Sequence, residues 1–118
     1  MLPAASRLTH RDEFAAIVRR GRSSGRSRLV VHVGRLADAS RPRAGFVVSK
    51  AVGGSVVRHR VARRLRHLVA PRLAWLPAAT GLVVRALPSS AGATSAELAH
   101  DLDAGLRGAL RKLGEGVR

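Results

Sequence analysis

The sequence contains no cysteine and very few aromatic residues. The absence of cysteine excludes zinc ribbons, iron–sulfur clusters, thiol catalysis and disulfide frameworks. The aromatic residues are Phe14, Phe46 and Trp75, with no tyrosine, which argues against recognition built mainly on stacking bases upon rings. The longest weakly polar stretch, residues 73–84, is interrupted by proline, threonine and glycine and is shorter than the roughly 20 residues of a membrane span. Because residues 1–14 also lack an apolar signal core, we expect a cytoplasmic protein with no membrane partner.

Acidic residues are scarce as well. There are 7 of them against 22 lysines and arginines, which gives a formal net charge of +15. Residues 97–118 carry four charges of each sign, so the whole excess lies in residues 1–96. Self-repulsion of this size destabilises a compact chain unless a polyanion neutralises it, and nucleic acid is the obvious polyanion. The alternative is a merely solvated, arginine-rich surface from a GC-rich genome, but genome composition does not explain the excess of charge.

Length and patterning predict one mixed α and β domain over residues 1–118. A Thr9-x-x-Asp12 cap is expected to start a helix that runs through Arg20, with Gly21 as its stop. A capping box of Thr94 and Glu97 is expected to start the last helix, which ends at 114. The other predicted elements are a basic loop at 21–28 with room for one short strand, strands at 29–33, 44–49 and 81–87, a turn at 38–43, and a helix at 55–70 that ends or kinks at Pro71.

The helix expected at 55–70 carries the strongest functional signal. At 100° per residue, one face is apolar, with Val57, Val61, Leu65, Leu68 and Val69. The opposite face is cationic, with His59, Arg60, Arg63, Arg64, Arg66 and His67. Solvated helix faces normally mix charges of both signs, whereas this one has no acid, so we predict a helix that contacts RNA or DNA. Arg58 projects near the apolar edge of the first turn, where its guanidinium fork can hold a phosphate bidentately.

Residues 49–66 resemble the signature of the bacterial ribonuclease P protein subunit, S-K-K-x-G-x-A-V-x-R-N-R-x-K-R-x-x-R. Eight positions match in register: Ser49, Lys50, Gly53, Val56, Arg58, Arg60, Arg63 and Arg66. The R-L-x-x-x-x-D/E-F opening of that family is matched by Arg7, Leu8, Glu13 and Phe14. The sequence departs from the signature where His59 replaces asparagine, where Ala51 and Ala62 replace lysines, and where Gly54 and Ser55 replace the common Asn-Ala.

The resemblance implies an α+β fold, an αβββαβα two-layer sandwich with an unusual left-handed βαβ crossover, like a domain of a small-subunit ribosomal protein. It also implies an RNA-binding subunit of ribonuclease P. The RNA subunit of that enzyme removes the 5′ leader of precursor tRNA by hydrolysis with Mg²⁺, which is bound mainly by the RNA, and the protein aids the binding of leader and Mg²⁺. The implied partners are the ribonuclease P RNA and precursor tRNA rather than DNA. The expected RNA-binding residues are Lys50, Arg58, His59, Arg60, Arg63, Arg64 and Arg66.

In the family, a cleft between the first helix and the sheet binds the leader of precursor tRNA with aromatic side chains. The residues expected to form it here are Phe14, Val18, Val30, His32, Phe46 and Ser49. Val18 and His32 stand where phenylalanine and tyrosine are typical, so we expect the leader to be held mainly by charge.

The residues indicate no catalytic set and no metal site on the protein itself, because the carboxylates of 12–13 and 101–103 lie at opposite ends of the chain. A protein nuclease built on His59 is one alternative, but nothing nearby would orient its imidazole. A structural RNA binder like a ribosomal protein is a second alternative. A helix-turn-helix DNA binder is disfavoured because a strand, not a second helix, is expected after the basic helix.

Overall fold

A computed structural model of the chain describes residues 2–37 and 41–114. Its main elements follow the order αβββαβα, as the resemblance implies. In chain order they are α1 (Arg11–Arg20), β1 (Arg22–Gly25), β2 (Leu29–Arg35), β3 (Arg43–Val47), α2 (Ser55–Arg72), β4 (Thr80–Ala86) and α3 (Ser95–Leu113), with short 3₁₀ turns η1 (Ala4–Ser6), η2 (Leu73–Trp75) and η3 (Pro88–Gly92).

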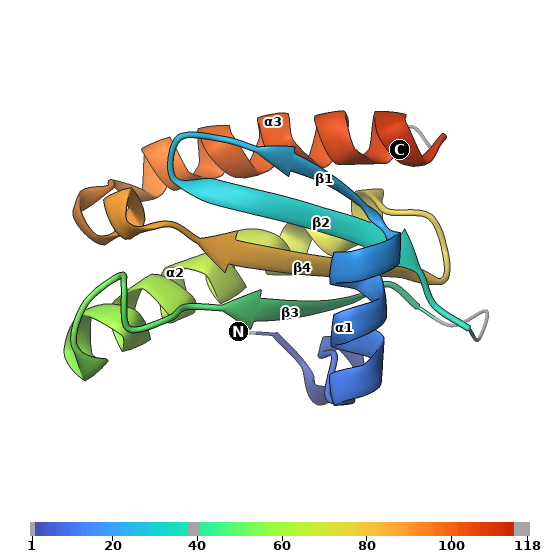
Figure 1. The fold of residues 1–118 in the computed structure, drawn as a ribbon, viewed down its shortest axis with the longest axis horizontal. Coiled ribbons are helices and arrows are strands. Elements are labelled where there is room, and N and C mark those ends of the chain that lie inside the picture. The colour runs from blue at the N-terminus through green and yellow to red at the C-terminus, as the bar shows by residue number, and fades with distance from the viewer. Residues whose placement is uncertain (1, 38–40, 115–118) are drawn as a thin grey trace.

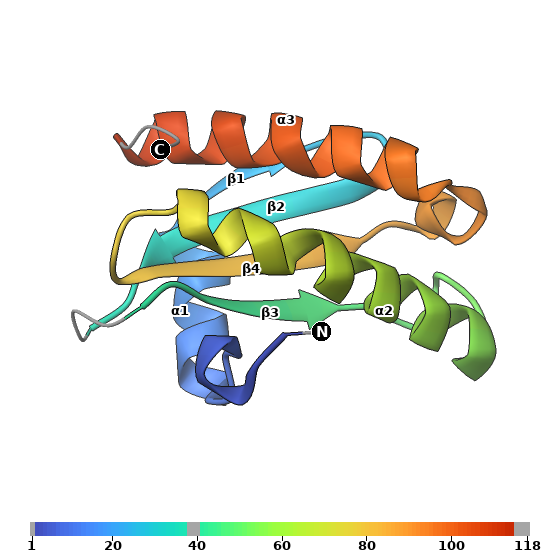
Figure 2. The same cartoon turned by 180° about the vertical axis from the view of Figure 1, so that it is seen from behind.

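The four strands form one sheet in the order β1-β2-β4-β3 (Figure 1). β2 pairs antiparallel with both β1 and β4, whereas β3 pairs parallel with β4. The parallel pair requires a crossover, which α2 provides. Seen from the side of α2 (Figure 2), the chain leaves β3, returns along α2 in front of the sheet and enters β4 above β3. This path makes the crossover left-handed, against the usual rule for such units.

Helices α2 and α3 cover one face of the sheet, and α1 lies across part of the other face (Figures 1 and 2). The main core between the sheet and the two long helices is built from leucine and valine, with Val61 and Leu65 of α2 fully buried in it. A smaller cluster under α1 joins Ile17 to Leu8, Leu36 and Val83. No helix in the described ranges is both long and apolar enough to cross a membrane.

The two long helices follow the sequence patterns closely. Thr94 caps α3 as predicted: its hydroxyl accepts from the backbone N–H of Glu97, and the Glu97 carboxylate accepts from the backbone N–H of Thr94. The helix ends at Gly114, which adopts the left-handed conformation with φ of 89°. Helix α2 continues through Pro71 to Arg72 instead of ending before it. Arg72 donates from Nη1 to the Leu68 carbonyl at 2.7 Å in this last turn.

The start of α1 corrects the prediction of a Thr9-x-x-Asp12 cap. The N-cap residue is His10, and no side chain caps the helix. The preceding segment is held to β3 instead, because Arg7 forms an isolated bridge with Ala44 and the Leu8 N–H donates to the Ala44 carbonyl at 2.8 Å. This tertiary pairing fixes where the chain turns into α1, and Thr9 lies one residue before the N-cap.

The segment 21–28, predicted as a basic loop, contains strand β1, at the place where one further short strand had room. Its backbone pairs with β2, and the Lys112 ammonium of α3 donates to the carbonyl of Ser23 at 2.7 Å. β3 ends at Val47 rather than residue 49, because the Val52 N–H donates to the Ser49 carbonyl in a turn. β4 starts and ends one residue earlier than predicted. The first half of the turn predicted at 38–43, residues 38–40, lies outside the described residues.

Candidate nucleic-acid interface

Helix α2 presents its basic residues to both sides of an apolar stripe that packs into the core. Val61, Leu65 and Val69 are buried, and the flanking Val57 and Leu68 are partly buried against the same core, as the helical period predicts. His59, Arg60, Arg63 and His67 are exposed, whereas Arg58, Arg64 and Arg66 are half-buried. The first turn of α2 contains no acidic residue, and its N-cap, Gly54, supplies no side-chain hydrogen bond. The N-terminal half of α2 is therefore strongly cationic.

Four carboxylates of the described chain pair with arginines of other elements. Glu13 binds Arg43, with a shortest contact of 2.8 Å, and Asp103 binds Arg72 at 2.6 Å. Arg28 binds both Glu97 at 2.9 Å and Asp101 at 3.4 Å. Within residues 2–37 and 41–114, no ion pair joins a carboxylate to the basic residues at 58–66. Their charge is left for an external anion.

A cavity of about 710 Å³ lies where α2, β3, α1 and the amino-terminal segment meet. It brings together Phe14 and Phe46, both predicted for the leader cleft, with Arg58, His59 and Arg66, all predicted to bind RNA. The remaining lining residues are Leu2, Arg7, Leu8, Ala44, Gly45, Val48, Ser55 and Ala62. The cavity thus combines apolar and aromatic surface with guanidinium groups, which suits a nucleotide chain better than a small apolar molecule.

Arg58 occupies the position in this cavity that its place at the apolar edge of α2 predicts. Its side chain is half-buried, and its Nε is fully buried without a hydrogen-bond partner in the described chain. A buried donor of this kind is costly unless a ligand accepts from it. A phosphate oxygen is a suitable acceptor, since arginine can hold phosphate through two parallel N–H groups.

The structure does not bring all the predicted cleft residues together. Val30 and His32 lie on the face of β2 against which α1 packs. They are spaced two residues apart and share this face with Gly34, which lies next to Ile17 of α1. Phe46 lies on the opposite face of the sheet, since it pairs with Val84 of the main core. The predicted leader surface is therefore divided by β3 into two parts, one facing α1 and one facing α2.

The remaining predicted residues lie around these two parts. Val18 is 43% exposed on α1, one helical turn after Phe14. Ser49 and Lys50 are exposed in the turn that leads from β3 to α2. Arg60, Arg63 and Arg64 do not line the cavity, because they project from the other flank of α2.

His32 is the one histidine of the described chain that is buried, with 9% of its surface exposed. Its Nε2 has no hydrogen-bond partner in the described chain. Burial lowers the pKa of His32 below its ordinary value, and the nearby positive charge of Arg85 lowers this pKa further. The imidazole is therefore held in its neutral form beside α1.

The cavity also contains residues that the basic pattern of α2 did not reveal. Arg7 lies in an extended segment, where it has no periodic neighbours, and its Nε donates to the Leu2 carbonyl at 2.9 Å. Leu2 and Leu8 are buried beside it. The match of Arg7 and Leu8 to the family's opening motif was the sequence signal that could have placed them here.

The described residues contain no group of three histidine, cysteine, aspartate or glutamate side chains that could hold a metal ion. Asp101 and Asp103 face different partners, Arg28 and Arg72, on two sides of α3. Asp101 and Asp103 are thus each engaged by an arginine and do not point at a common position where both could bind one Mg²⁺.

Comparisons with known proteins agree with this geometry. The sequence model of the family described as ribonuclease P matches residues 2–110. The chain is 55% identical to the ribonuclease P protein component of Streptomyces griseus, with all of both chains covered. It is 56% identical to the ribonuclease P protein component of Beutenbergia cavernae, with 90% of this chain and 89% of the relative covered.

Two solved structures have the same fold. The ribonuclease P protein of Staphylococcus aureus superposes with a TM-score of 0.79 at 22% identity, over 97% of this chain and 99% of that one. The ribonuclease P protein of Thermotoga maritima superposes with a TM-score of 0.71 at 20% identity, over 83% of this chain and 92% of that one. At such low identity the likeness establishes the architecture, including the αβββαβα order.

Proposed function

Because the chain belongs to the ribonuclease P protein family, we propose that it is the RNA-binding subunit of ribonuclease P, which removes the 5′ leader from precursor tRNA by phosphodiester hydrolysis. The observation that carries this proposal is the cavity lined by Phe14 and Phe46 together with Arg58, His59 and Arg66. Such a recess offers rings or apolar surface to bases and guanidinium groups to phosphates. It is the chemistry required to hold a flexible stretch of RNA.

In this proposal the protein binds and the RNA subunit catalyses. Arg58 and Arg66 hold phosphates from α2, and Lys50 adds a charge at the turn before that helix. Phe14 and the neighbouring surface of α1 contact the leader. Mg²⁺ is bound mainly by the RNA, and the protein aids the binding of leader and Mg²⁺ to the complex. The partners are the ribonuclease P RNA and precursor tRNA, and the place of action is the cytoplasm, where tRNA is matured.

The proposal is tested by cleavage of precursor tRNA over a series of magnesium concentrations. The protein alone is expected to cleave at none of them, because the two neighbouring carboxylates of the described chain, Glu97 and Asp101, are both bound by Arg28 rather than free to hold metal ions. With a bacterial ribonuclease P RNA added, cleavage is expected at lower magnesium than the RNA requires alone. Cleavage by RNA-free protein that disappears in His59→Ala would instead establish a protein nuclease.

A structural RNA binder like a ribosomal protein is the other candidate function. It would share the basic α2 but would bind ribosomal RNA and show no dependence on a leader. Purification of the protein from cells with its bound RNA separates the two. Enrichment of one structured RNA of several hundred nucleotides supports ribonuclease P, whereas enrichment of ribosomal RNA alone contradicts it.

A further inference from the structure

Strand β1 forms one edge of the sheet (Figure 1). The hairpin of β1 and β2 closes where the Arg26 N–H donates to the Leu29 carbonyl at 2.7 Å. Because backbone groups point inward and outward alternately along an antiparallel pair, Ser23 and Gly25 direct their N–H and C=O groups away from β2. The Lys112 ammonium, which reaches the Ser23 carbonyl from α3, agrees with this alternation. We refer to the outer side of residues 23–25 as the β1 edge.

The β1 edge is accessible and almost unpaired. Ser23 and Gly25 are exposed, and a Cβ built on Gly25 meets nothing within 4 Å. Within residues 2–37 and 41–114, neither the N–H groups of Ser23 and Gly25 nor the Gly25 carbonyl has a hydrogen-bond partner. Only the Ser23 carbonyl is covered, at 2.7 Å, by the exposed side chain of Lys112. Lysine is a common cover for an edge strand, and an incoming peptide N–H can replace it.

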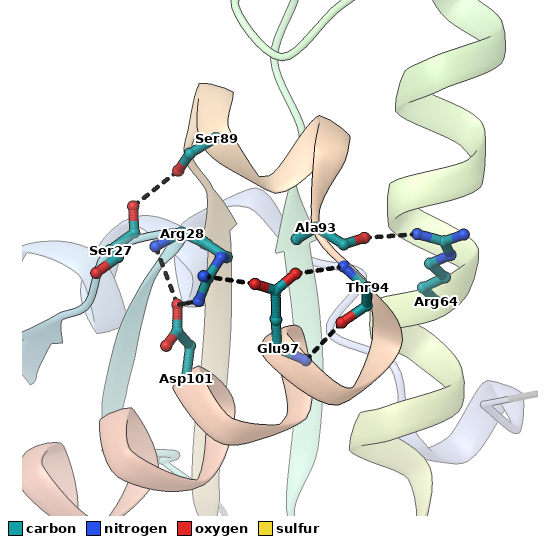
Figure 3. A network of polar contacts seen from close by, with 8 residues as sticks. All are labelled: Ser27, Arg28, Arg64, Ser89, Ala93, Thr94, Glu97 and Asp101. Carbon is teal, nitrogen blue, oxygen red and sulfur yellow. Dashed lines mark hydrogen bonds and ion pairs between the residues drawn. The ribbon is translucent and has the colours of Figure 1, made fainter.

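The turn at the end of β1 is fixed in place by a polar network (Figure 3). Arg28 binds Glu97 at 2.9 Å and Asp101 at 3.4 Å, which ties the hairpin to α3. The Ser89 hydroxyl donates to the Ser27 carbonyl at 2.8 Å, which ties the same turn to η3. The β1 edge is therefore oriented before any partner arrives, and this lowers the entropic cost of binding.

The surroundings of the β1 edge are positively charged. Arg22 and Arg26 are exposed at the two ends of β1, and Lys112 is exposed on the adjoining part of α3. In the part of the chain that the structure describes, none of these three residues forms an ion pair with a carboxylate. The two acids of α3 beside the hairpin are both engaged by Arg28. The β1 edge thus combines free backbone groups with uncompensated positive charge.

We propose that the β1 edge is a docking site for an extended, acidic segment of another protein, which adds a strand to the sheet beside β1. Backbone groups of the segment pair with those of Ser23 and Gly25, and its carboxylates meet Arg22, Arg26 and Lys112. β1 and β3 are opposite edges of the sheet, and the cavity beside Phe14 is lined from β3. A partner at the β1 edge therefore does not compete with a ligand in that cavity.

The backbone pattern favours a protein segment over RNA. Phosphate oxygens accept hydrogen bonds but donate none, so they can pair with the N–H groups of Ser23 and Gly25 and not with the carbonyls beside them. An extended peptide supplies a donor and an acceptor at every second residue, with the spacing of the edge itself.

Amide hydrogen exchange of the full chain, followed by NMR, tests the pairing. The probe is a peptide of about ten residues that alternates glutamate with threonine, a residue that favours strands. We expect it to slow exchange of the Ser23 and Gly25 amides by on the order of tenfold. The same peptide N-methylated at every residue keeps its charge but has no backbone donor, and it should not slow them. Equal slowing by both peptides, or none by the unmethylated one, would overturn the inference.

Paired charge variants test where the acidic peptide binds. Arg22→Gln with Arg26→Gln removes two exposed charges beside the edge, and Arg60→Gln with Arg63→Gln removes two exposed charges from α2. We expect the first pair to weaken binding of the fluorescently labelled peptide by on the order of fivefold, and the second pair by less than about twofold. Equal losses would show a response to net charge alone and contradict the proposed site. Unfolding midpoints verify that each variant is folded.

A short oligouridylate tests the other class of partner. We expect this RNA to leave exchange at Ser23 and Gly25 unchanged. If it slows their exchange as much as the peptide does, or more, the β1 edge is a nucleic-acid contact and the inference is wrong. None of these measurements uses ribonuclease P RNA or precursor tRNA, so their failure leaves the proposed function standing, and failure of the cleavage test leaves this inference standing.

Discussion

The carbonyl oxygen of Val33 occupies the position that a Cβ atom at residue 21 would need, so only glycine fits there. A Cβ built on Gly21 would lie 2.1 Å from that oxygen and 2.5 Å from the carbonyl oxygen of Ile17. Gly21 has an ordinary negative φ of −76°, so its role at the end of α1 is close approach rather than a left-handed conformation. The atoms it meets belong to the backbone and cannot rotate away.

We therefore expect Gly21→Ala to reduce the free energy of unfolding by about 3 kcal/mol, at the upper end of overpacking effects. Urea denaturation measures the loss. Gly25→Ala is the matched control, because a Cβ at the other end of β1 meets nothing within 4 Å. Equal stability of the two variants would contradict the close approach of α1 to β2.

Thr94→Ala should destabilise the protein by about 1 kcal/mol, because it removes the hydroxyl that accepts from the Glu97 N–H at the start of α3. Thr9→Ala provides the comparison. Thr9 lies outside α1 and caps nothing, so its removal should change stability by less than about 0.5 kcal/mol. Thermal unfolding of both variants measures the two changes in stability. A loss of stability in Thr9→Ala larger than that in Thr94→Ala would show that Thr9 does cap α1, as the sequence pattern predicts.

Lowering the pH should reduce the free energy of unfolding through protonation of His32. Its pKa in the folded state lies below the ordinary value of 6.5, so the unfolded chain takes up the proton first as the pH falls. The contribution of neutral His32 to the free energy of unfolding is fully present above pH 6.5, and it is lost as the pH falls toward the lowered pKa of the folded state. In His32→Leu the free energy of unfolding should fall less between pH 7.5 and 5.5 than in the wild type. His67→Gln, at an exposed site, should leave the wild-type decline unchanged.

An aromatic side chain at Val18, which is exposed, should strengthen the leader contact, whereas a ring at the buried His32 would not reach RNA. A ring at residue 18 would lie one turn from Phe14 on the same face of α1, and stacking contributes roughly 1–3 kcal/mol per base. We expect Val18→Phe to bind precursor tRNA more tightly than the wild type and with less dependence on salt. Mature tRNA without a leader is the control substrate. If the gain is the same with and without the leader, this surface does not contact it.

The long helices were predictable from sequence because their signals are repeated. Val61, Leu65 and Val69 recur at the helical period along α2, and several turns of burial outweigh the proline at position 71. β1 was less predictable, since residues 22–25 carry no apolar alternation, and the strand forms through backbone pairing with β2. Thr9 was misread because the start of α1 depends on the contact with Ala44, which local sequence does not encode.

The candidate site was predictable where it depended on charge and less so where it depended on sheet geometry. The arginines of α2 were evident from the absence of acids around them. The opposite orientations of His32 and Phe46 follow from the pairing of β2 and β3 with β4, which the sequence alone does not reveal. The cavity that unites Phe14 with Arg58 depends on the same pairing, because β3 lies between the two helices that carry them.

The position of β4 also sets the order in which the chain can fold during synthesis. β4 is the last strand to leave the ribosome, yet it lies between β2 and β3 at the centre of the sheet. Until residues 80–86 emerge, β3 has no strand to pair with, and only the hairpin of β1 and β2 can form. Such non-local pairing slows folding. We therefore expect a nascent chain to carry the arginines of α2 before β3 is held in the sheet and the cavity beside that helix is complete.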